Sequence, residues 1–220
     1  LAVAAFSTGQ SSSPAAALDN GDDVGIICSN GPTFDMTTDA DYISLPDGNT
    51  VYMYGYKLTG TPFQHPSPVL CVDEGDTVTI TLTNTLPRDI SMVFPGQHDV
   101  LANGAPATPQ FTNPADPATL TSLTQVATAH GGTATYSFVA DHPGTFLYES
   151  GTDPDVQVRM GLFGALIVRP AMGPDYAYNV PDDRFTTHIE GDPTLSAQNN
   201  TLIGANNTEE FMVLLSEIDP

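Results

Sequence analysis

The feature that most constrains the fold of this chain is a set of short segments in which apolar and polar residues alternate between turn-forming residues. Thr77–Leu82 alternates after the turn signal Glu74–Asp76, and Thr133–Ala140 alternates before the turn composition of Asp141–Gly144. A period of two places successive side chains on opposite faces, which is the pattern of a half-buried β-strand. Together with the absence of a convincing amphipathic helix or an internal repeat, this pattern predicts an all-β chain.

Further strands are expected where apolar and β-branched residues cluster between turn signals. These segments are Val51–Tyr56, Leu70–Val72, Ile90–Phe94, Thr145–Glu149, Leu162–Arg169 and Glu210–Ile218. The Pro-, Ala- and Asn-rich residues 103–118 are expected to form a long loop. Regular short strands at this spacing favour a β-sandwich.

Composition changes along the chain predict four regions. Residues 1–23 are rich in Ala, Ser and Gly and are expected to be a flexible arm, and residues 24–170 hold the sandwich. Residues 171–208, rich in Asp, Asn, Gly and Pro, are expected to be a linker or long loop. Residues 209–220 are expected to form an apolar terminal strand that needs a partner sheet, either the sandwich itself or a second domain that begins there.

The charge balance excludes several classes of partner. Five Lys and Arg face 26 Asp and Glu, which gives a formal net charge of −21. Such a field repels nucleic acid and anionic membrane surfaces. The longest apolar run, Leu162–Val168, is too short to span a bilayer. Because the chain opens with Leu-Ala-Val-Ala-Ala-Phe and no Met, we expect a removed leader or its tail, and a secreted, periplasmic or cell-surface location.

Two cysteines, Cys28 and Cys71, are the whole thiol inventory. In an acidic, Thr-rich chain expected to be exported, a disulfide is favoured over two buried thiols or a share in a metal site. It would close a loop of about 44 residues and stabilise the fold by on the order of 4 kcal/mol. Zinc is disfavoured because neither cysteine has another Cys or His at close ligand spacing.

Several blocks of this sequence resemble the first cupredoxin domain of multicopper oxidases. They are Pro66–Asn84, Gly131–Phe138, and His142–Gly151 followed by Met160–Val168. Phe211–Asp219 is similar to the strand that opens the second domain of that family. The resemblance covers roughly residues 50–170 and implies a Greek-key cupredoxin β-sandwich.

The same resemblance implies that the copper chemistry of the family is missing from this segment. The family reduces oxygen at a trinuclear copper cluster held by four His-X-His pairs, two of them in the first domain, because imidazoles suit copper. Those two pairs should fall at Ser91–Val93 and at Glu149–Gly151, and neither triplet contains histidine. A mononuclear blue-copper site would need Cys and His near Met160, and neither occurs there. We therefore expect no catalytic or cofactor-binding residue here, with copper only in any further domains.

Two residues remain as weak metal candidates. His98 lies beyond the first missing pair and is expected to reach the same end of the sandwich. Glu149 places a carboxylate at a lost ligand position on a strand expected to face inward. Its alternatives are a hydrogen-bonded carboxylate at the domain edge, a hard-cation ligand or a proton relay. No two histidines are two or four residues apart, so the others are interpreted as solvated: His65, His130, His142 and His188.

Two functions follow as hypotheses. The first is an exported multicopper-oxidase-like protein whose domain shown here is catalytically silent. The alternative is a non-catalytic cupredoxin-fold module that assembles into an extracellular complex, filament or surface layer. In either case the partners are further cupredoxin domains or copies of the chain, joined through strand pairing. A cation-binding adhesion domain is a third and weaker hypothesis.

Overall fold

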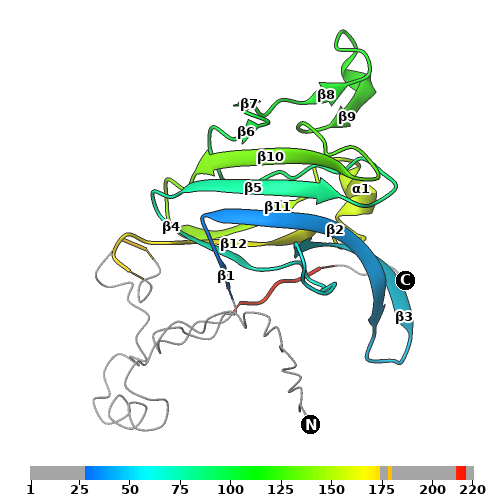
Figure 1. The fold of residues 1–220 in the computed structure, drawn as a ribbon, viewed down its shortest axis with the longest axis horizontal. Coiled ribbons are helices and arrows are strands. Elements are labelled where there is room, and N and C mark those ends of the chain that lie inside the picture. The colour runs from blue at the N-terminus through cyan, green and yellow to red at the C-terminus, as the bar shows by residue number, and fades with distance from the viewer. Residues whose placement is uncertain (1–27, 174–177, 180–211, 217–220) are drawn as a thin grey trace, which may run out of the picture.

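The structure is a computed structural model that describes residues 28–173, 178–179 and 212–216 of the chain (Figure 1). Within these residues almost all regular structure is β. In chain order the elements are β1 Ser29–Asn30, β2 Thr33–Ser44, β3 Thr50–Leu58, β4 Leu70–Asp73, β5 Thr77–Asn84, β6 Leu101–Ala102, β7 Ala105–Pro106, β8 Gln110–Phe111, the 3-10 helix η1 Pro117–Thr119, β9 Leu120–Ser122, β10 Gly132–Val139, β11 Gly144–Glu149, α1 Pro154–Gln157 and β12 Phe163–Arg169.

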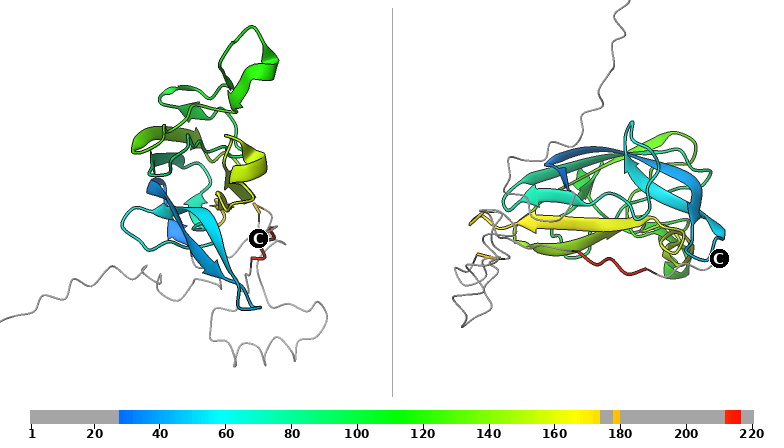
Figure 2. Two further views of the ribbon diagram at one scale, coloured as in Figure 1. Left: turned by 90° about the vertical axis from the view of Figure 1, so that its right-hand side faces the viewer. Right: turned by 90° about the horizontal axis from the view of Figure 1, so that it is seen from below.

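The strands form two main sheets that pack as a sandwich (Figures 1 and 2). One sheet has the order β1-β4-β12-β11, and the other has the order β3-β2-β5-β10-β6-β7. Each sheet contains a parallel pair of strands that are not consecutive in the chain: β4 lies parallel to β12, and β2 lies parallel to β5. The strands therefore cross between sheets, and the predicted all-β sandwich is confirmed.

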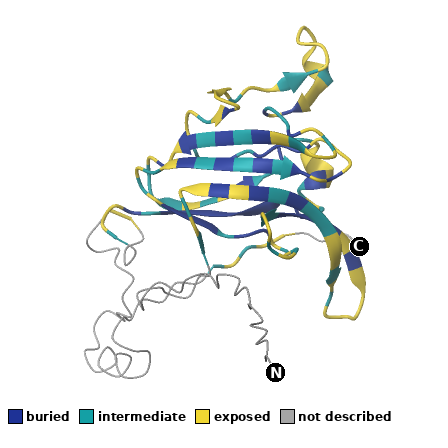
Figure 3. Ribbon diagram, in the orientation of Figure 1, coloured by how far each residue is buried: buried dark blue, intermediate teal, exposed yellow. Residues whose placement is uncertain are grey.

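The alternating segments build the core as their sequence predicts. Along β5 every second side chain is buried, and β10 pairs with it in antiparallel register, with Tyr136 opposite Ile80. The burial alternates visibly along these two strands (Figure 3). The side chains facing inward from both sheets form one hydrophobic core.

Three fully buried tyrosines tie the core to the backbone around it. The hydroxyl of Tyr56 donates to the carbonyl of Ser91 at 2.7 Å, that of Tyr136 to Gln125 at 2.7 Å, and that of Tyr148 to Pro68 at 2.5 Å. Burial raises the pKa of all three phenols, so each stays neutral and keeps its donor.

The disulfide between Cys28 and Cys71 is confirmed. Their Cα atoms lie 5.6 Å apart across a sequence separation of 43. The bond joins the start of the described chain to β4, beside the parallel pairing of Asn30 with Cys71. It therefore closes the long loop that the sequence predicted.

Two strand predictions need correction. The sequence reasoning did not name β2, the longest strand, although it pairs with both β3 and β5. Conversely, Ile90–Phe94 forms no strand. It meets its neighbours only through the isolated bridges Ile90–Ala127 and Val93–Glu149, so no continuous ladder can form.

The outer regions are covered only in part. The predicted arm 1–23 lies outside the described residues, as does most of the predicted linker 171–208. The strand expected over 210–218 is not formed by its described part, Met212–Ser216. Among the helices of the described residues, none has the length and apolar character needed to cross a bilayer.

Candidate functional site

The fold brings together the two triplets at which the resemblance places copper ligands. The segment Ser91–Val93 lies beside the end of β11, where the amide of Val93 donates to Glu149 at 2.8 Å and the amide of Glu149 donates to Val93 at 3.1 Å. The two triplets are 58 positions apart in sequence (149 minus 91) and adjacent in space. The two triplets to which the resemblance assigns the ligand pairs are therefore neighbours in the fold.

A cluster of hydroxyl groups occupies this place, and we call it the hydroxyl cluster. The Oγ of Ser91 lies 3.0 Å from the Oγ of Ser122 and 2.9 Å from the Oγ1 of Thr152. Ser122 and Thr152 close the triangle at 2.9 Å. Because Ser91 and Ser122 are fully buried, these groups satisfy one another in place of water.

Gly151 has no room for a side chain. A Cβ atom added there would lie 2.7 Å from a methyl carbon of Val93, 3.1 Å from the Oγ of Ser91 and 3.2 Å from the Cβ of Leu123. The first of these separations is shorter than packed carbon atoms tolerate. The family position at Gly151 is therefore filled by neighbouring side chains.

Buried amides fix the backbone around the hydroxyl cluster. Asn84, at the end of β5, accepts from Thr38 at 2.9 Å and from the amide of Leu86 at 3.0 Å. Its Nδ2 donates to the carbonyls of Arg88 and Ala127 at 2.7 and 2.9 Å.

The buried amide of Gln157 also fixes the backbone near the hydroxyl cluster. It accepts from the hydroxyl of Ser150 at 2.6 Å and donates to the carbonyl of Asp89 at 3.1 Å. The sequence reasoning did not single out Ser122, Thr152 or Gln157, because no local spacing marks them.

Glu149 does not face the core, which corrects the expectation of an inward-facing carboxylate. Tyr148 and Ser150 on either side of it are buried, whereas Glu149 is half-buried. Since strand residues alternate in direction, Glu149 lies on the outer face of its sheet. There it lines a hollow of about 270 Å³ with Arg159, Phe163 and Leu214.

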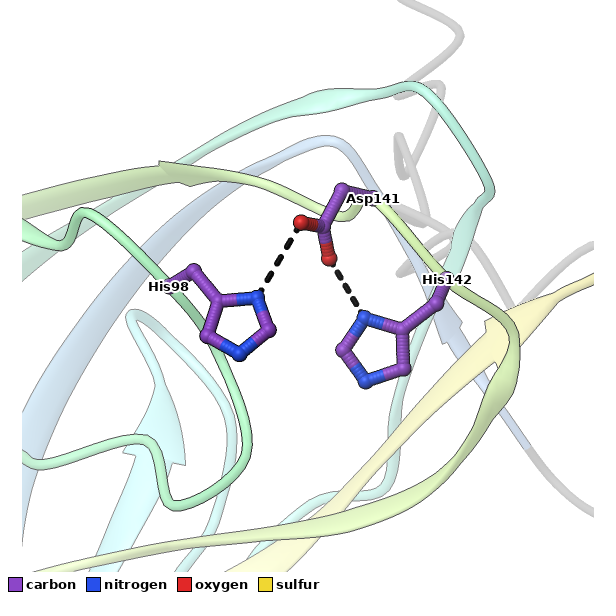
Figure 4. A group of neighbouring side chains, drawn as sticks. All are labelled: His98, Asp141 and His142. Carbon is purple, nitrogen blue, oxygen red and sulfur yellow. Dashed lines mark hydrogen bonds and ion pairs between the residues drawn. The ribbon is translucent and has the colours of Figure 1, made fainter.

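His98 belongs to a different group, at the other end of β11. Its Nδ1 lies 3.1 Å from the Oδ2 of Asp141, while the Oδ1 of Asp141 is bonded to the Nδ1 of His142 (Figure 4). The rings of His98 and His142 have centroids 5.4 Å apart. These three residues form the histidine cluster. Each of the three side chains offers one candidate ligand atom, and these atoms all lie within 4.8 Å of one another. Among the described residues, no other group of three or more His, Cys, Asp or Glu side chains meets this criterion.

The position of His98 is a second correction. Asp141 and His142 precede β11, which begins at Gly144, whereas the expected ligand triplet begins where β11 ends. A six-residue strand spans roughly 20 Å. His98 therefore does not reach the end of the sandwich that holds Ser91.

Phe146 supports both loops of the histidine cluster. The edge of the His142 ring meets Phe146 at right angles, with centroids 5.1 Å apart. Gly96, two residues before His98, has φ of +89° and lies so close to Phe146 that an added Cβ would be 2.7 Å from its Cδ1. A turn with Gln97 donating to the carbonyl of Phe94 at 3.0 Å completes this loop.

Hydrogen bonds from His142 and His98 hold the pKa of Asp141 below its usual value, and partial desolvation opposes this weakly. The carboxylate is therefore ionised at neutral pH. The side chains of His98, Asp141 and His142 are 68%, 47% and 41% exposed, so an ion in solution has access to them. Asp99 and Thr77 line a hollow of about 190 Å³ beside His98 and Asp141.

Comparison with known proteins agrees with this architecture. The family model described as multicopper oxidase matches residues 47–173. The chain is 34% identical over 116 residues to an L-ascorbate oxidase of Cucurbita pepo var. melopepo, covering 53% of this chain and 19% of that protein. It is 32% identical over 127 residues to Laccase-25 of Oryza sativa subsp. japonica, covering 57% of this chain and 19% of that protein.

A solved structure shares the fold. The chain has a TM-score of 0.52 and 25% identity to the blue copper oxidase from Nitrosomonas europaea, over 70% of this chain and 42% of that one. This chain thus belongs to the multicopper oxidase family, and its sandwich is a cupredoxin domain of that family. The match spans about a fifth of the length of the curated relatives.

Proposed function

We propose that this chain is a first cupredoxin domain of an exported multicopper-oxidase-like protein and that it supplies no copper ligand at the family positions. Any copper redox chemistry would then be carried by other domains. The observation that carries the proposal is the hydroxyl cluster at the meeting point of Ser91–Val93 and Glu149–Gly151.

The residues at that meeting point do not fit the copper cluster of the family. Neutral hydroxyls replace imidazoles, and copper favours imidazole and sulfur ligands over them. Ser91 already has hydrogen-bond partners within the protein, and Gly151 is packed against Val93. A trinuclear cluster would require both new donors and new space, so no reaction step is assigned to this end of the domain.

The segment Met212–Ser216 supports a role in packing against a following domain. It runs beside the β11 side of the sandwich (Figure 2), and Leu214 lines the hollow with Glu149 and Phe163. Val213 and Leu215 are 68% and 87% exposed, so their apolar surface is left uncovered by the described residues. Apolar side chains exposed on alternate positions are suited to contact with another protein layer.

The proposed location outside the cytoplasm is supported by the disulfide. Disulfides persist in oxidising compartments and are rare in the reducing cytosol. The net charge of −21 agrees with the absence of nucleic acid among the proposed partners.

The test is copper stoichiometry in a chain that lacks the histidine cluster. The variant His98→Ala/His142→Ala, loaded with Cu(II) by equilibrium dialysis, is expected to retain no stoichiometric copper and to show no oxygen consumption with a reductant. One or more coppers per chain in this variant, with oxidase activity, would contradict catalytic silence.

The alternative, a structural module that assembles through its terminal strands, makes a different prediction. It requires the 220-residue chain to form concentration-dependent assemblies. Deletion of residues 209–220 should abolish these assemblies if the module hypothesis holds. Analytical ultracentrifugation of both forms decides between the two, since the first hypothesis expects a monomer for each.

A further inference from the structure

We propose that the histidine cluster binds one divalent transition-metal ion, with the Nε2 atoms of His98 and His142 as ligands and Asp141 as the carboxylate that holds both rings. This site lies at the opposite end of β11 from the family ligand positions, and it does not depend on the proposed function.

The hydrogen bonds of the histidine cluster determine which ring nitrogens are free. An ionised carboxylate only accepts hydrogen bonds, so the Nδ1 atoms that face Asp141 carry the protons. In each neutral ring Nε2 then has a free lone pair. Figure 4 shows both Nε2 atoms pointing away from Asp141 toward the same side. A carboxylate behind each imidazole is the usual outer-shell arrangement of histidine metal ligands.

The two loops are held in place before any ion binds. Asp141 bridges them, and Phe146 packs against both Gly96 and the ring of His142. An ion therefore meets two imidazoles whose approach is already constrained. The ring centroids are 5.4 Å apart, and the partly exposed side chains of His98 and His142 can turn so that both Nε2 atoms reach one ion.

The charge around the cluster favours a cation. Asp99 lines the adjoining hollow, and His142 interacts electrostatically with Glu74. The whole chain carries a net charge of −21, which raises the local concentration of cations.

The donor set selects the class of ion. Imidazole suits zinc, copper and nickel, whereas calcium and magnesium favour sites built of oxygen ligands alone. Affinity among divalent ions of the first row peaks at copper, so Cu(II) should bind more tightly than Zn(II).

The experiment uses the 220-residue chain and two metal probes. Isothermal titration with Zn(II) is expected to give one site per chain. The variant His98→Ala/His142→Ala should lose that site, with a fall in affinity beyond the roughly 10–100-fold that loss of an outer-shell partner costs. The matched control is His130→Asn, which removes another exposed histidine and leaves a residue that tolerates its φ of 60°. This control should bind as the wild type does.

Electron paramagnetic resonance of bound Cu(II) tests the role of each residue. The wild-type spectrum should show coupling to two imidazole nitrogens. Asp141→Asn keeps one oxygen acceptor, so it should keep the two-nitrogen signature while weakening affinity by about 10–100-fold. Binding in the wild type that is no tighter than in His98→Ala/His142→Ala would overturn the proposal and leave the cluster as a surface ion pair. A copper spectrum without coupling to two nitrogens would also overturn it.

Discussion

The two ends of β11 make opposite use of polar side chains. At the Glu149 end, hydroxyl and amide groups are buried and bonded to one another, and no titratable group takes part in the hydroxyl cluster. At the Gly144 end, His98 and Asp141 are exposed, His142 is half-buried, and Asp141 is bonded to both histidines. The resemblance places the family's copper ligands at the first end, whereas the metal site that we propose lies at the second.

This difference supports the proposal that the chain keeps the cupredoxin fold without copper ligands at the family positions. The backbone of Val93 pairs with that of Glu149 where the resemblance expects ligands, and neither Ser91–Val93 nor Glu149–Gly151 contains histidine. Hydroxyl groups and a closely packed glycine occupy this place, and the hydroxyls bond to one another because buried donors without partners cost free energy. The fold then depends on packing at that end, and loss of a side chain there costs stability. Loss of a side chain in the histidine cluster should change ion binding instead.

The largest expected effect comes from Asn84, which supports the buried end. Asn84→Ala leaves the hydroxyl of Thr38, the amide of Leu86 and the carbonyl of Arg88 without their partner, and it removes one of the two donors to the carbonyl of Ala127. We expect a loss of about 3 kcal/mol in the free energy of unfolding, because buried polar groups without partners cost roughly 1–3 kcal/mol each and some of them will find water. Urea denaturation measures it. The exposed Asn49→Ala is the control, with a change within about 0.5 kcal/mol.

Substitution of Gly151 tests whether neighbouring side chains fill the space around it. Gly151→Ala places a methyl group against Val93 and Ser91, and it should cost about 2 kcal/mol of stability. Adding Val93→Ala removes the nearest contact. The double variant should therefore be less destabilised than the sum of the two single variants. Strict additivity would mean that the space at Gly151 is open, contrary to this account.

Substitution of Gly96 tests whether Phe146 supports the histidine cluster. Gly96→Ala combines a positive φ with a Cβ only 2.7 Å from Phe146, whereas Gly104 has a φ of +78° and open space around it. Each substitution should cost about 1 kcal/mol from backbone strain. The Gly96→Ala variant should in addition bind Zn(II) several-fold more weakly, since Phe146 must move. Equal Zn(II) affinity in the Gly96→Ala and Gly104→Ala variants would mean that Phe146 does not hold the histidine cluster in place.

The smallest expected effect is the contribution of His65 to the pH dependence of folding stability. Burial lowers its pKa below 6.5, and its Nδ1 is buried without a hydrogen-bond partner among the described residues. The unfolded chain therefore binds more protons than the folded chain as the pH falls below about 6.5. The stabilisation that comes from neutral His65 should be complete at neutral pH. It should decline as the pH falls through the pKa of His65 in the folded chain. His65→Gln should show a flatter melting temperature between pH 7 and pH 5 than the wild type, and an unchanged slope would contradict this.

Much of the sandwich could be predicted from the sequence, because β5 and β10 alternate cleanly between apolar and polar residues. The strand β2 was missed for a physical reason. Its buried position Thr38 is polar, and its hydroxyl is satisfied by Asn84, a partner 46 residues away. The alternation of apolar and polar residues is therefore interrupted at Thr38, a polar residue that is buried because of its partner in the tertiary fold.

The functional residues were harder to predict. The resemblance singled out Ser91–Val93 and Glu149–Gly151, and the fold brings these segments together. That they correspond to the ligand positions of the family stays a prediction. It gave no sign that Ser122 and Thr152 would complete the hydroxyl cluster. The histidine cluster could not be found from spacing either, since His98 and His142 are 44 positions apart (142 minus 98). Only the turn before β11 and the packing of Gly96 on Phe146 bring them together.

The most direct test of the account is the number of coppers bound per chain by the wild type and by His98→Ala/His142→Ala, measured by elemental analysis after equilibrium dialysis against Cu(II). We expect one copper in the wild type and none in the variant, because the hydroxyl cluster offers no imidazole and the histidine cluster offers two. Copper retained by the variant, or absent from the wild type, would contradict it.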